Sequence, residues 1–470
     1  MSCIGSLRGR WAAPLGYREV LRIGLPLLAG MISTTIMQFT DRLFLSHYSL
    51  EAIAASAPAV MASLTLQMTF HGICSYSSVL AAQYIGARAL NRVGPAVWQG
   101  VWCALFCSLL LLGACFMAEP LFDFVGHEED VRILEVRYFI TLTSGASLAL
   151  LGAALSSYFF GRGLTKPVMW ANMAAALVNI ALDYMLIFGE FGAPELGILG
   201  AGLATAAGWL TTLIILAVLI FRRENDAVYH VLRGWRPERD LFLRLVRFGL
   251  PGGMQFFVEF TGMTWFMFEL GSLGKIPMAA SNIVFAINNF TFMPMLGLSM
   301  AAATMVGQAM GRQCPLEAET AALHALHLAF FYMFCTAALI VFFAGDLMDV
   351  FRRASSQAAE GDFDKVRATG IVLLYYVALY SLVDAANLIF FGALRGAGDT
   401  VMMMKIIVVC VFLFLFVPFS ILHMGGWISL HRLWLVFTAY VFILAACVTL
   451  RFRSRKWHKI KVIEAVRVVN

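Results

Sequence analysis

Apolar runs alternate with short polar segments along the whole chain. A helix that crosses a bilayer needs about 20 predominantly apolar residues. Twelve runs reach this length, although the very hydrophobic stretch 400–450 can be divided in more than one way. We therefore predict an all-α polytopic membrane protein. The predicted spans are residues 22–46, 52–82, 95–118, 131–160, 166–189, 196–221, 242–272, 277–308, 318–344, 366–394, 400–423 and 427–450.

The composition supports this prediction. Of the 470 residues, 61% are hydrophobic and only 13% are charged, and the mean hydropathy is +0.81. Soluble domains carry about 25% charged residues.

The net charge of +6 is distributed in a way that indicates topology rather than a nucleic-acid partner. Lys and Arg cluster in alternate gaps between the spans, whereas the intervening gaps are acidic. The positive-inside rule then places both termini and the segment 222–241 in the cytoplasm. The basic clusters are Arg8 to Arg22, Arg88 and Arg92, Arg162 and Lys166, Arg222 to Arg247, Arg312, Arg395, and Arg451 to Arg467.

Cysteine and histidine spacing favours neither a metal site nor a disulfide framework. The nine Cys form no Cys-x-x-Cys pair, and most lie within apolar spans. Cys103 and Cys107 share a helix face and are interpreted as small buried hydrophobes. His324 and His327 have no evident third ligand. No cofactor is expected.

The chain contains an internal duplication. Arg22-Ile-Gly-Leu-Pro26 recurs 225 residues later as Arg247-Phe-Gly-Leu-Pro251, and the same offset relates Gln83 to Gln308 and Gly86 to Gly311. Further on, Arg162-Gly163 and Arg395-Gly396 are related by an offset of 233. The difference of eight residues fits a longer loop around 345–365.

Each half of the duplication holds six spans. An even number of spans restores the starting side, so the halves share one orientation and are related by an axis along the membrane normal. We predict two pseudo-symmetric six-helix lobes with a cleft at their interface. The expected divisions are an N-terminal lobe 1–221, a cytoplasmic linker 222–241, a C-terminal lobe 242–450 and a basic cytoplasmic tail 451–470.

The carboxylates inside the spans include Asp41, Asp183, Glu259, Glu269 and Asp384. A charged side chain at the centre of a membrane helix costs about 2.5–3.5 kcal/mol on insertion scales, so such residues usually mark a path for ions or substrate. None of the five is duplicated at the repeat offset, which indicates that each lobe has its own chemistry.

In the N-terminal half, Asn179 and Asp183 share one helix face at i and i+4. Asp41 lies at similar depth in the first span, so both acids could reach one pocket. Burial favours the protonated form of a carboxyl group, and a second carboxylate nearby reinforces this. Arg42 would favour the charged form of Asp41 if it reached that side chain. Pro26 is expected near the start of the first helix, where proline costs little.

In the C-terminal half, Tyr380 and Asp384 share a helix face, and Glu259 lies near mid-depth of the seventh span. Carboxylate and hydroxyl oxygens suit a hard cation. Glu269 lies near the outer end of its span.

Several motifs, in this order and spacing, resemble the multidrug and toxic compound extrusion (MATE) family over about residues 18–450. They are Gly24-Leu-Pro26 followed by Asp41, Asn179-Ile-Ala-Leu-Asp183, Gly192-Ala-Pro-Glu-Leu-Gly197 before Gly200-Ala-Gly202, Glu259 after Pro251, and Tyr380-Ser-Leu-Val-Asp384 before Leu394-Arg-Gly396.

The resemblance implies twelve helices in two lobes that form a V, and a secondary antiporter that exports amphipathic, often cationic compounds in exchange for protons or sodium. It also implies a proton site at Asp41, Asn179 and Asp183, with Asp183 central. Glu259, Tyr380 and Asp384 match positions that hold a sodium ion in the sodium-coupled branch, and Glu259 resembles a proton-exchanging glutamate of eukaryotic members. We favour protons as the coupling ion.

The remaining expectations concern cargo and location. Aromatic and methionine side chains make a pliable surface for varied apolar cations, and we place Gln67, Met68, Phe285 and Phe290 in the substrate cavity. The protein is expected to be a monomer in the bilayer of the plasma (inner) membrane, and not an enzyme.

Three alternatives stay open. A lipid or lipid-linked oligosaccharide flippase of the same superfamily would favour a cationic cavity, whereas acids dominate the spans here. A membrane enzyme would need a paired-His metal motif or a Ser/His dyad, and neither is visible in the spans. A receptor or scaffold would not need five buried acids.

Overall fold

A computed structural model of the chain describes residues 11, 15–125, 128–352 and 360–464, and every regular element in these ranges is a helix. Arg8 and Arg467 of the predicted basic clusters, and part of the predicted loop 345–365, lie outside the described residues. The helices are α2 (Tyr17–Tyr48), α3 (Leu50–Cys74), α4 (Ser77–Gly86), α5 (Val93–Cys115), α6 (Ala118–Val125), α7 (Glu129–Gly161), α8 (Lys166–Phe188), α9 (Ile198–Ile220), α10 (Arg223–Tyr229), α11 (Arg239–Ser272), α12 (Lys275–Gly311), α13 (Pro315–Phe342), α14 (Ala344–Arg352), α15 (Glu360–Ala397), α16 (Thr400–Val411), α17 (Val417–Met424) and α18 (Leu430–Arg453).

These helices confirm the predicted twelve-span, all-α fold. Each predicted span coincides with one long helical segment. Two of the spans consist of two consecutive helices: α3 and α4 form one, and α16 and α17 form the other. Eleven segments of the described chain are long and apolar enough to cross a membrane. The twelfth, α11, is more polar because it carries Gln255, Glu259 and Glu269.

The helix ends and breaks follow from local sequence. Ser49 caps α3, since its hydroxyl accepts a hydrogen bond from the Ala52 amide at 2.9 Å. Gly189 ends α8 in the left-handed conformation that glycine adopts without strain. Pro26 lies well inside α2, because that helix already begins at Tyr17. The expected position of Pro26 near a helix start is therefore wrong.

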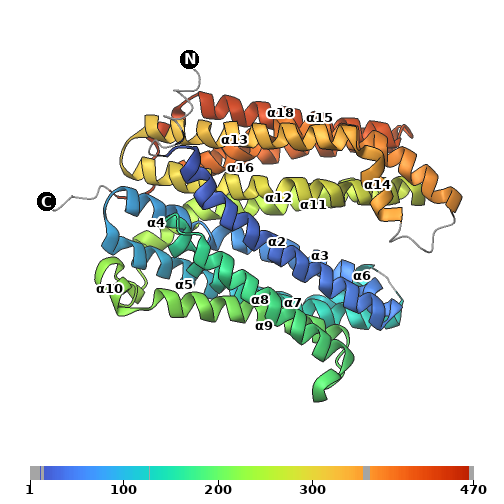
Figure 1. Ribbon diagram of the computed structural model, residues 1–470, viewed down its shortest axis with the longest axis horizontal. Helices are drawn as coiled ribbons and strands as arrows, with labels where there is room; N and C mark the ends of the chain where they lie inside the picture. Colours follow the sequence, from blue (N-terminus) through green and yellow to red (C-terminus); the bar gives the residue numbers. More distant parts are fainter. Residues whose placement is uncertain (1–10, 12–14, 126–127, 353–359, 465–470) are drawn as a thin grey trace. The chain divides into compact units, whose positions relative to one another are not determined.

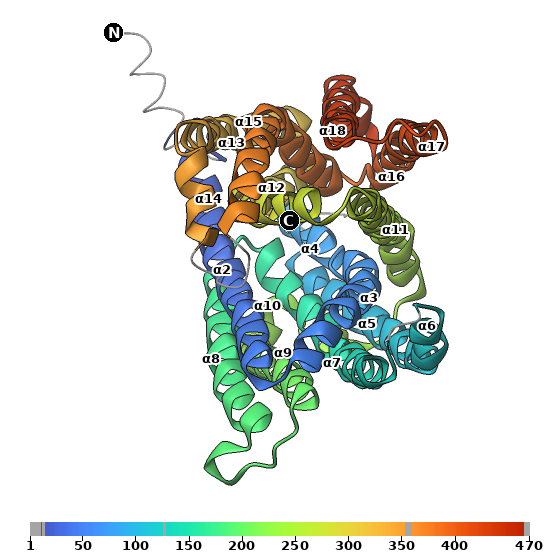
Figure 2. The same cartoon turned by 90° about the vertical axis from the view of Figure 1, so that its right-hand side faces the viewer.

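The chain forms two compact units. Of the described residues, unit 1 comprises those up to Gly24 and those within Val258–Val306 and Pro315–Ile460. Unit 2 comprises the described residues within Leu25–Phe257 and Gly307–Cys314, together with Lys461 to Glu464. In unit 2, α7 packs against α3, α5 and α9, and α9 also packs against α8 (Figure 1). In unit 1, α15 packs against α13 and α18, and α16 lies beside α18 (Figure 2).

The duplication is visible in the packing of the first helix of each half. A Cβ atom added to Gly24 of α2 would lie 3.3 Å from the Leu298 side chain of α12. The equivalent Gly249 of α11 would meet the Ile73 carbonyl of α3 at 2.8 Å. The offset of 225 relates Gly24 to Gly249 and Ile73 to Leu298. A close contact between equivalent residues therefore occurs once in unit 1 and once in unit 2.

A second pair of glycines makes a reciprocal crossing inside unit 2. A Cβ atom at Gly86 would lie 2.0 Å from the Gln308 carbonyl oxygen, and one at Gly311 would lie 2.0 Å from the Gln83 carbonyl oxygen. Only a hydrogen atom fits at either place. The ends of α4 and α12 therefore cross at residues that the duplication relates to one another.

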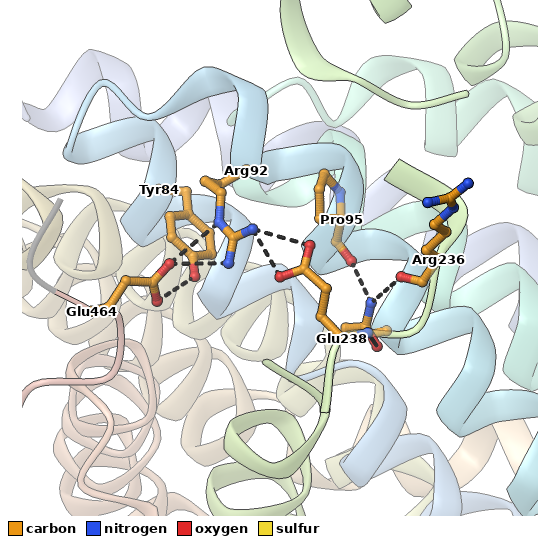
Figure 3. Close-up of polar contacts among 7 residues, drawn as sticks. Tyr84, Arg92, Pro95, Arg236, Glu238 and Glu464 are labelled. Carbon is orange, nitrogen blue, oxygen red and sulfur yellow. Dashed lines mark hydrogen bonds and ion pairs between the residues drawn. The ribbon is translucent and has the colours of Figure 1, made fainter. Parts of the chain in front are cut away.

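A polar network fastens the linker and the C-terminal segment to the N-terminal half within unit 2 (Figure 3). The Arg92 guanidinium donates to both Glu238 oxygens at 3.0 and 2.8 Å, and to a Glu464 oxygen at 3.1 Å. The Tyr84 hydroxyl donates to the other Glu464 oxygen at 2.8 Å. Burial disfavours the charged form of Glu464, but hydrogen bonds from the backbone and Tyr84, together with the Arg92 charge, hold the pKa of Glu464 below its ordinary value.

Candidate functional site

The structure brings the three predicted proton-site residues together inside unit 2. Asp41 extends from α2, and Asn179 and Asp183 from α8. Asp41 is 7% exposed, and Asn179 and Asp183 are fully buried. The Asp41 carboxyl group lies within interaction distance of the Asp183 and Asn179 side chains. Thr205 of α9 adds a hydroxyl that donates to Asp41 Oδ2 at 3.3 Å.

Glycines allow the helices around these acids to approach closely. A Cβ atom at Gly208 of α9 would lie 3.2 Å from the Ala175 carbonyl oxygen and 3.4 Å from Asn179 Cβ. At Gly30 of α2, it would lie 3.3 Å from the Asn172 amide nitrogen of α8. Bare backbone at these points lets α2, α8 and α9 converge on this cluster of polar side chains.

Few hydrogen bonds satisfy the polar atoms of this cluster. Among the described residues, no hydrogen-bond partner is found for either oxygen of Asp183, for either polar atom of the Asn179 amide or for Asp41 Oδ1. The Tyr138 side chain of α7 is buried beside both acids and interacts electrostatically with them. Buried polar groups are normally paired, and the neighbouring Asp41 and Asp183 carboxyl groups can share a proton or bind another small cation.

Arg42 does not neutralise this cluster of acids. Its side chain is exposed, and in the part of the chain that the structure describes it makes no ion pair with Asp41. Neighbours at i and i+1 point to different faces of a helix. Arg42 acts on Asp41 only through its more distant charge.

The C-terminal acids form a second polar group inside unit 1. Asp384 of α15 accepts a hydrogen bond from the Asn387 amide at 3.0 Å. Tyr380, one turn earlier, is 4% exposed, and its hydroxyl has no hydrogen-bond partner among the described side chains and backbone. The Tyr440 hydroxyl of α18 interacts with the charges of both Asp384 and Glu259 of α11. These oxygens could hold a hard cation such as sodium.

Tyr440 was missed by sequence reasoning. It is one of several aromatic residues in a strongly apolar span, and no motif distinguishes it. Only the packing of α15 against α18 places it beside the acids.

Glu269 is joined to a histidine rather than to the other acids of unit 1. Its side chain is buried, and Oε2 lies 3.1 Å from His423 Nδ1 of α17. The His423 side chain is 63% exposed, so the pair links a buried carboxyl group to the surface.

The four residues predicted for the substrate cavity fall in two units. In unit 2, Gln67 is buried and Met68 is half-buried on α3. In unit 1, Phe285 of α12 stacks on Trp434 with ring centroids 5.1 Å apart, within an aromatic cluster. Phe290 is 67% exposed. A role for these residues in substrate binding stays a prediction.

Comparison with known proteins decides the family. The MatE family model matches residues 26–185 and 251–421, one segment in each half of the duplication. The chain belongs to the MatE family. The resemblance seen in the sequence motifs is thereby confirmed, and the chain is a multidrug efflux transporter of the MATE type. Members of this family are membrane transporters rather than enzymes.

Individual relatives agree over nearly the whole chain. The probable multidrug resistance protein NorM of Bradyrhizobium diazoefficiens is 29% identical over 441 residues, which cover 93% of each chain. The outward-facing structure of a multidrug resistance MATE family transporter matches with a TM-score of 0.85 at 20% identity, over 98% of this chain and 99% of the other. A MOP superfamily transporter from Pyrococcus furiosus matches with a TM-score of 0.82 at 20% identity, over 93% and 95%. At this identity the structures support the fold alone.

Proposed function

We propose that this chain exports amphipathic organic cations in exchange for protons, by alternating access of an N-terminal lobe 1–221 and a C-terminal lobe 242–450. Asp41, Asn179 and Asp183 form the proton-coupling site. The observation that carries the proposal is a pair of buried carboxyl groups on α2 and α8 whose oxygens are largely free of hydrogen-bond partners among the described residues. A site without fixed partners can exchange a proton for another cation without breaking a stable ion pair.

The proposed location follows from the charge pattern. The chain lies in the plasma (inner) membrane as a monomer, with both termini, the linker 222–241 and the tail 451–470 in the cytoplasm. Cargo would be small amphipathic cations, because the buried ionisable groups of the spans are mainly acids.

Energetics limit the stoichiometry. One charge crossing 100 mV is worth about 2.3 kcal/mol, and a tenfold concentration ratio about 1.4 kcal/mol. Exchange of one monovalent cation for one proton moves no net charge, so the pH gradient alone would drive it. Exchange for two protons would add the voltage.

Sodium is the second candidate coupling ion, and the oxygens of Asp384 and Tyr380 favour it. These atoms lie on one face of α15, and Asp384 also acts on Tyr440 together with Glu259. An oxygen-rich group of this kind matches the preference of sodium for hard ligands.

Reconstituted efflux would test both candidates. Purified protein in vesicles is loaded with ethidium, and a pH gradient and a sodium gradient are imposed separately. Efflux driven by the pH gradient alone supports the proposal. Efflux driven only by sodium assigns coupling to the C-terminal group, and movement of lipid-linked sugars without ethidium efflux would favour a flippase.

A further inference from the structure

Three buried thiols meet inside unit 2, away from the acids. Cys74 is 0% exposed, Cys103 is 2% exposed and Cys107 is 3% exposed. Their Sγ atoms all lie within 4.8 Å of one another. The sequence places Cys103 and Cys107 on one face of a helix, but nothing in the spacing indicates that Cys74 joins them.

The fold brings these thiols together at the break between α3 and α4. Cys74 is the last residue of α3, and Ser77 begins α4. The Ser77 hydroxyl oxygen lies within hydrogen-bonding distance of the Cys74 carbonyl and of Ser157 Oγ of α7, each at 2.8 Å. A Cβ atom at Gly100 of α5 would lie 2.6 Å from Ser77 Oγ. Bare backbone at Gly100 therefore lets α5 approach the break, and Cys103 and Cys107 follow on the same face of α5.

The geometry fits one central atom bound by three sulfurs. Bonds of about 2.3 Å, the length of a metal–thiolate bond, place three sulfurs at most about 4 Å apart. The sulfur separations of the cluster, none above 4.8 Å, exceed that spacing by less than 1 Å at most. No fourth His, Cys, Asp or Glu of the described chain belongs to the group, whereas a structural zinc ion normally takes four ligands.

The net charge of the resulting complex distinguishes among the ions that prefer sulfur ligands. The cluster lies in two segments that are apolar enough to span a membrane, where an unbalanced charge is costly. Three thiolates leave a net charge of −2 with Cu(I) and −1 with Zn(II), but with As(III) the charges cancel. Arsenous acid is itself neutral, and As(OH)₃ with three thiols gives As(SR)₃ and three waters, so neither charge nor redox state changes.

We propose that Cys74, Cys103 and Cys107 form a three-thiol site that binds trivalent arsenic as a neutral tris-thiolate complex. Occupation of the site ties the end of α3 to the middle of α5. Because only the folded chain gathers the three sulfurs, binding stabilises the folded state.

Arsenite binding to the purified full-length protein tests this site. The protein is reduced, freed of metal and titrated with sodium arsenite, and bound arsenic is measured by mass spectrometry together with the thermal unfolding temperature. We expect one arsenic per chain and a raised Tm. Each of C74A, C103A and C107A should weaken binding by more than about 100-fold, since even partners of metal ligands contribute 10–100-fold.

Two cysteines of unit 1 provide a matched control. Cys410 and Cys447 interact with one another, so they form a two-thiol pair in the same chain. C410A and C447A should leave arsenite binding unchanged. The proposal is overturned if the wild type binds no arsenic, if the controls lose binding as the three variants do, or if the three variants bind as the wild type does. Tighter binding of Cu(I) or Zn(II), or a disulfide within the cluster that persists in reductant, would also overturn it.

Discussion

Replacement of Asp183 by Asn should abolish proton-driven efflux and at the same time stabilise the folded protein. Asparagine has nearly the shape of aspartate but cannot bind and release a proton near neutral pH. If Asp183 holds the proton that drives export, then transport stops. If Asp183 serves packing alone, transport continues. The second measurement, stability, separates a lost proton site from a damaged fold.

The expected gain in stability follows from the free atoms around Asp183. Neither of its buried oxygens has a hydrogen-bond partner among the described residues, and an unsatisfied buried polar group costs about 1–3 kcal/mol. In the Asp183→Asn variant, the new amide group lies within reach of Asp41, whose Oδ1 atom also lacks a described partner. A hydrogen bond to a charged group contributes about 1.5–3 kcal/mol. We therefore expect this substitution to raise the free energy of unfolding by about 1–3 kcal/mol.

Asp399→Asn provides a control of opposite sign. The Asp399 carboxylate is 5% exposed and accepts a hydrogen bond from Arg451 Nε at 2.6 Å. Its neutralisation leaves the arginine charge unpaired, which should cost on the order of 3 kcal/mol. Efflux from vesicles under an imposed pH gradient and thermal unfolding in detergent are measured for both variants. An Asp183→Asn protein that exports normally, or that is destabilised as Asp399→Asn is, would refute the reasoning.

Three further predictions concern the other described features. Asp384→Asn should remove any stimulation of efflux by sodium, and an unchanged sodium dependence would reject a sodium site there. Glu464→Gln should lower stability at pH 7 by about 0.5–1 kcal/mol because the pair is partly exposed. The pKa of Glu464 lies below its ordinary value of 4.5. The stability that the ionised Glu464 contributes is therefore complete above pH 4.5, and it is lost as the pH falls through the lowered pKa. The unfolding curves of the wild type and the variant should accordingly converge in acid. Gly86→Ala should destabilise by about 1–3 kcal/mol or more, because its Cβ would lie 2.0 Å from the Gln308 carbonyl oxygen. Gly113→Ala should not, because no atom of the described residues would lie within 4 Å of its Cβ.

The sequence was sufficient for the fold because the spans are long and the charged gaps between them are short. Each predicted span coincides with a helical segment, although α2 begins several residues earlier than expected and so encloses Pro26. Helix periodicity also placed Asn179 and Asp183 on one face. Burial of both, and the approach of Asp41, follow from how the helices pack.

The sequence did not predict how each helix is rotated about its axis or which residues of other helices it contacts. Nearly every position in an apolar span is hydrophobic, so periodicity does not distinguish the face toward lipid from the face toward another helix. For this reason no sequence pattern indicated that Tyr440 lies beside Asp384 or that Cys74 lies beside Cys103. Likewise, a basic tail predicts attraction to anionic lipid, but it does not predict that Glu464 binds Arg92.

The composition of the two units also bears on how the two halves of the gene depend on one another. The residues up to Gly24 belong to unit 1 although the rest of α2 belongs to unit 2, and Arg239–Phe257 of α11 belong to unit 2 although the rest of that helix belongs to unit 1. Expressed alone, either half of the present gene would lack a segment that completes its bundle, whereas both halves expressed together could restore the full set.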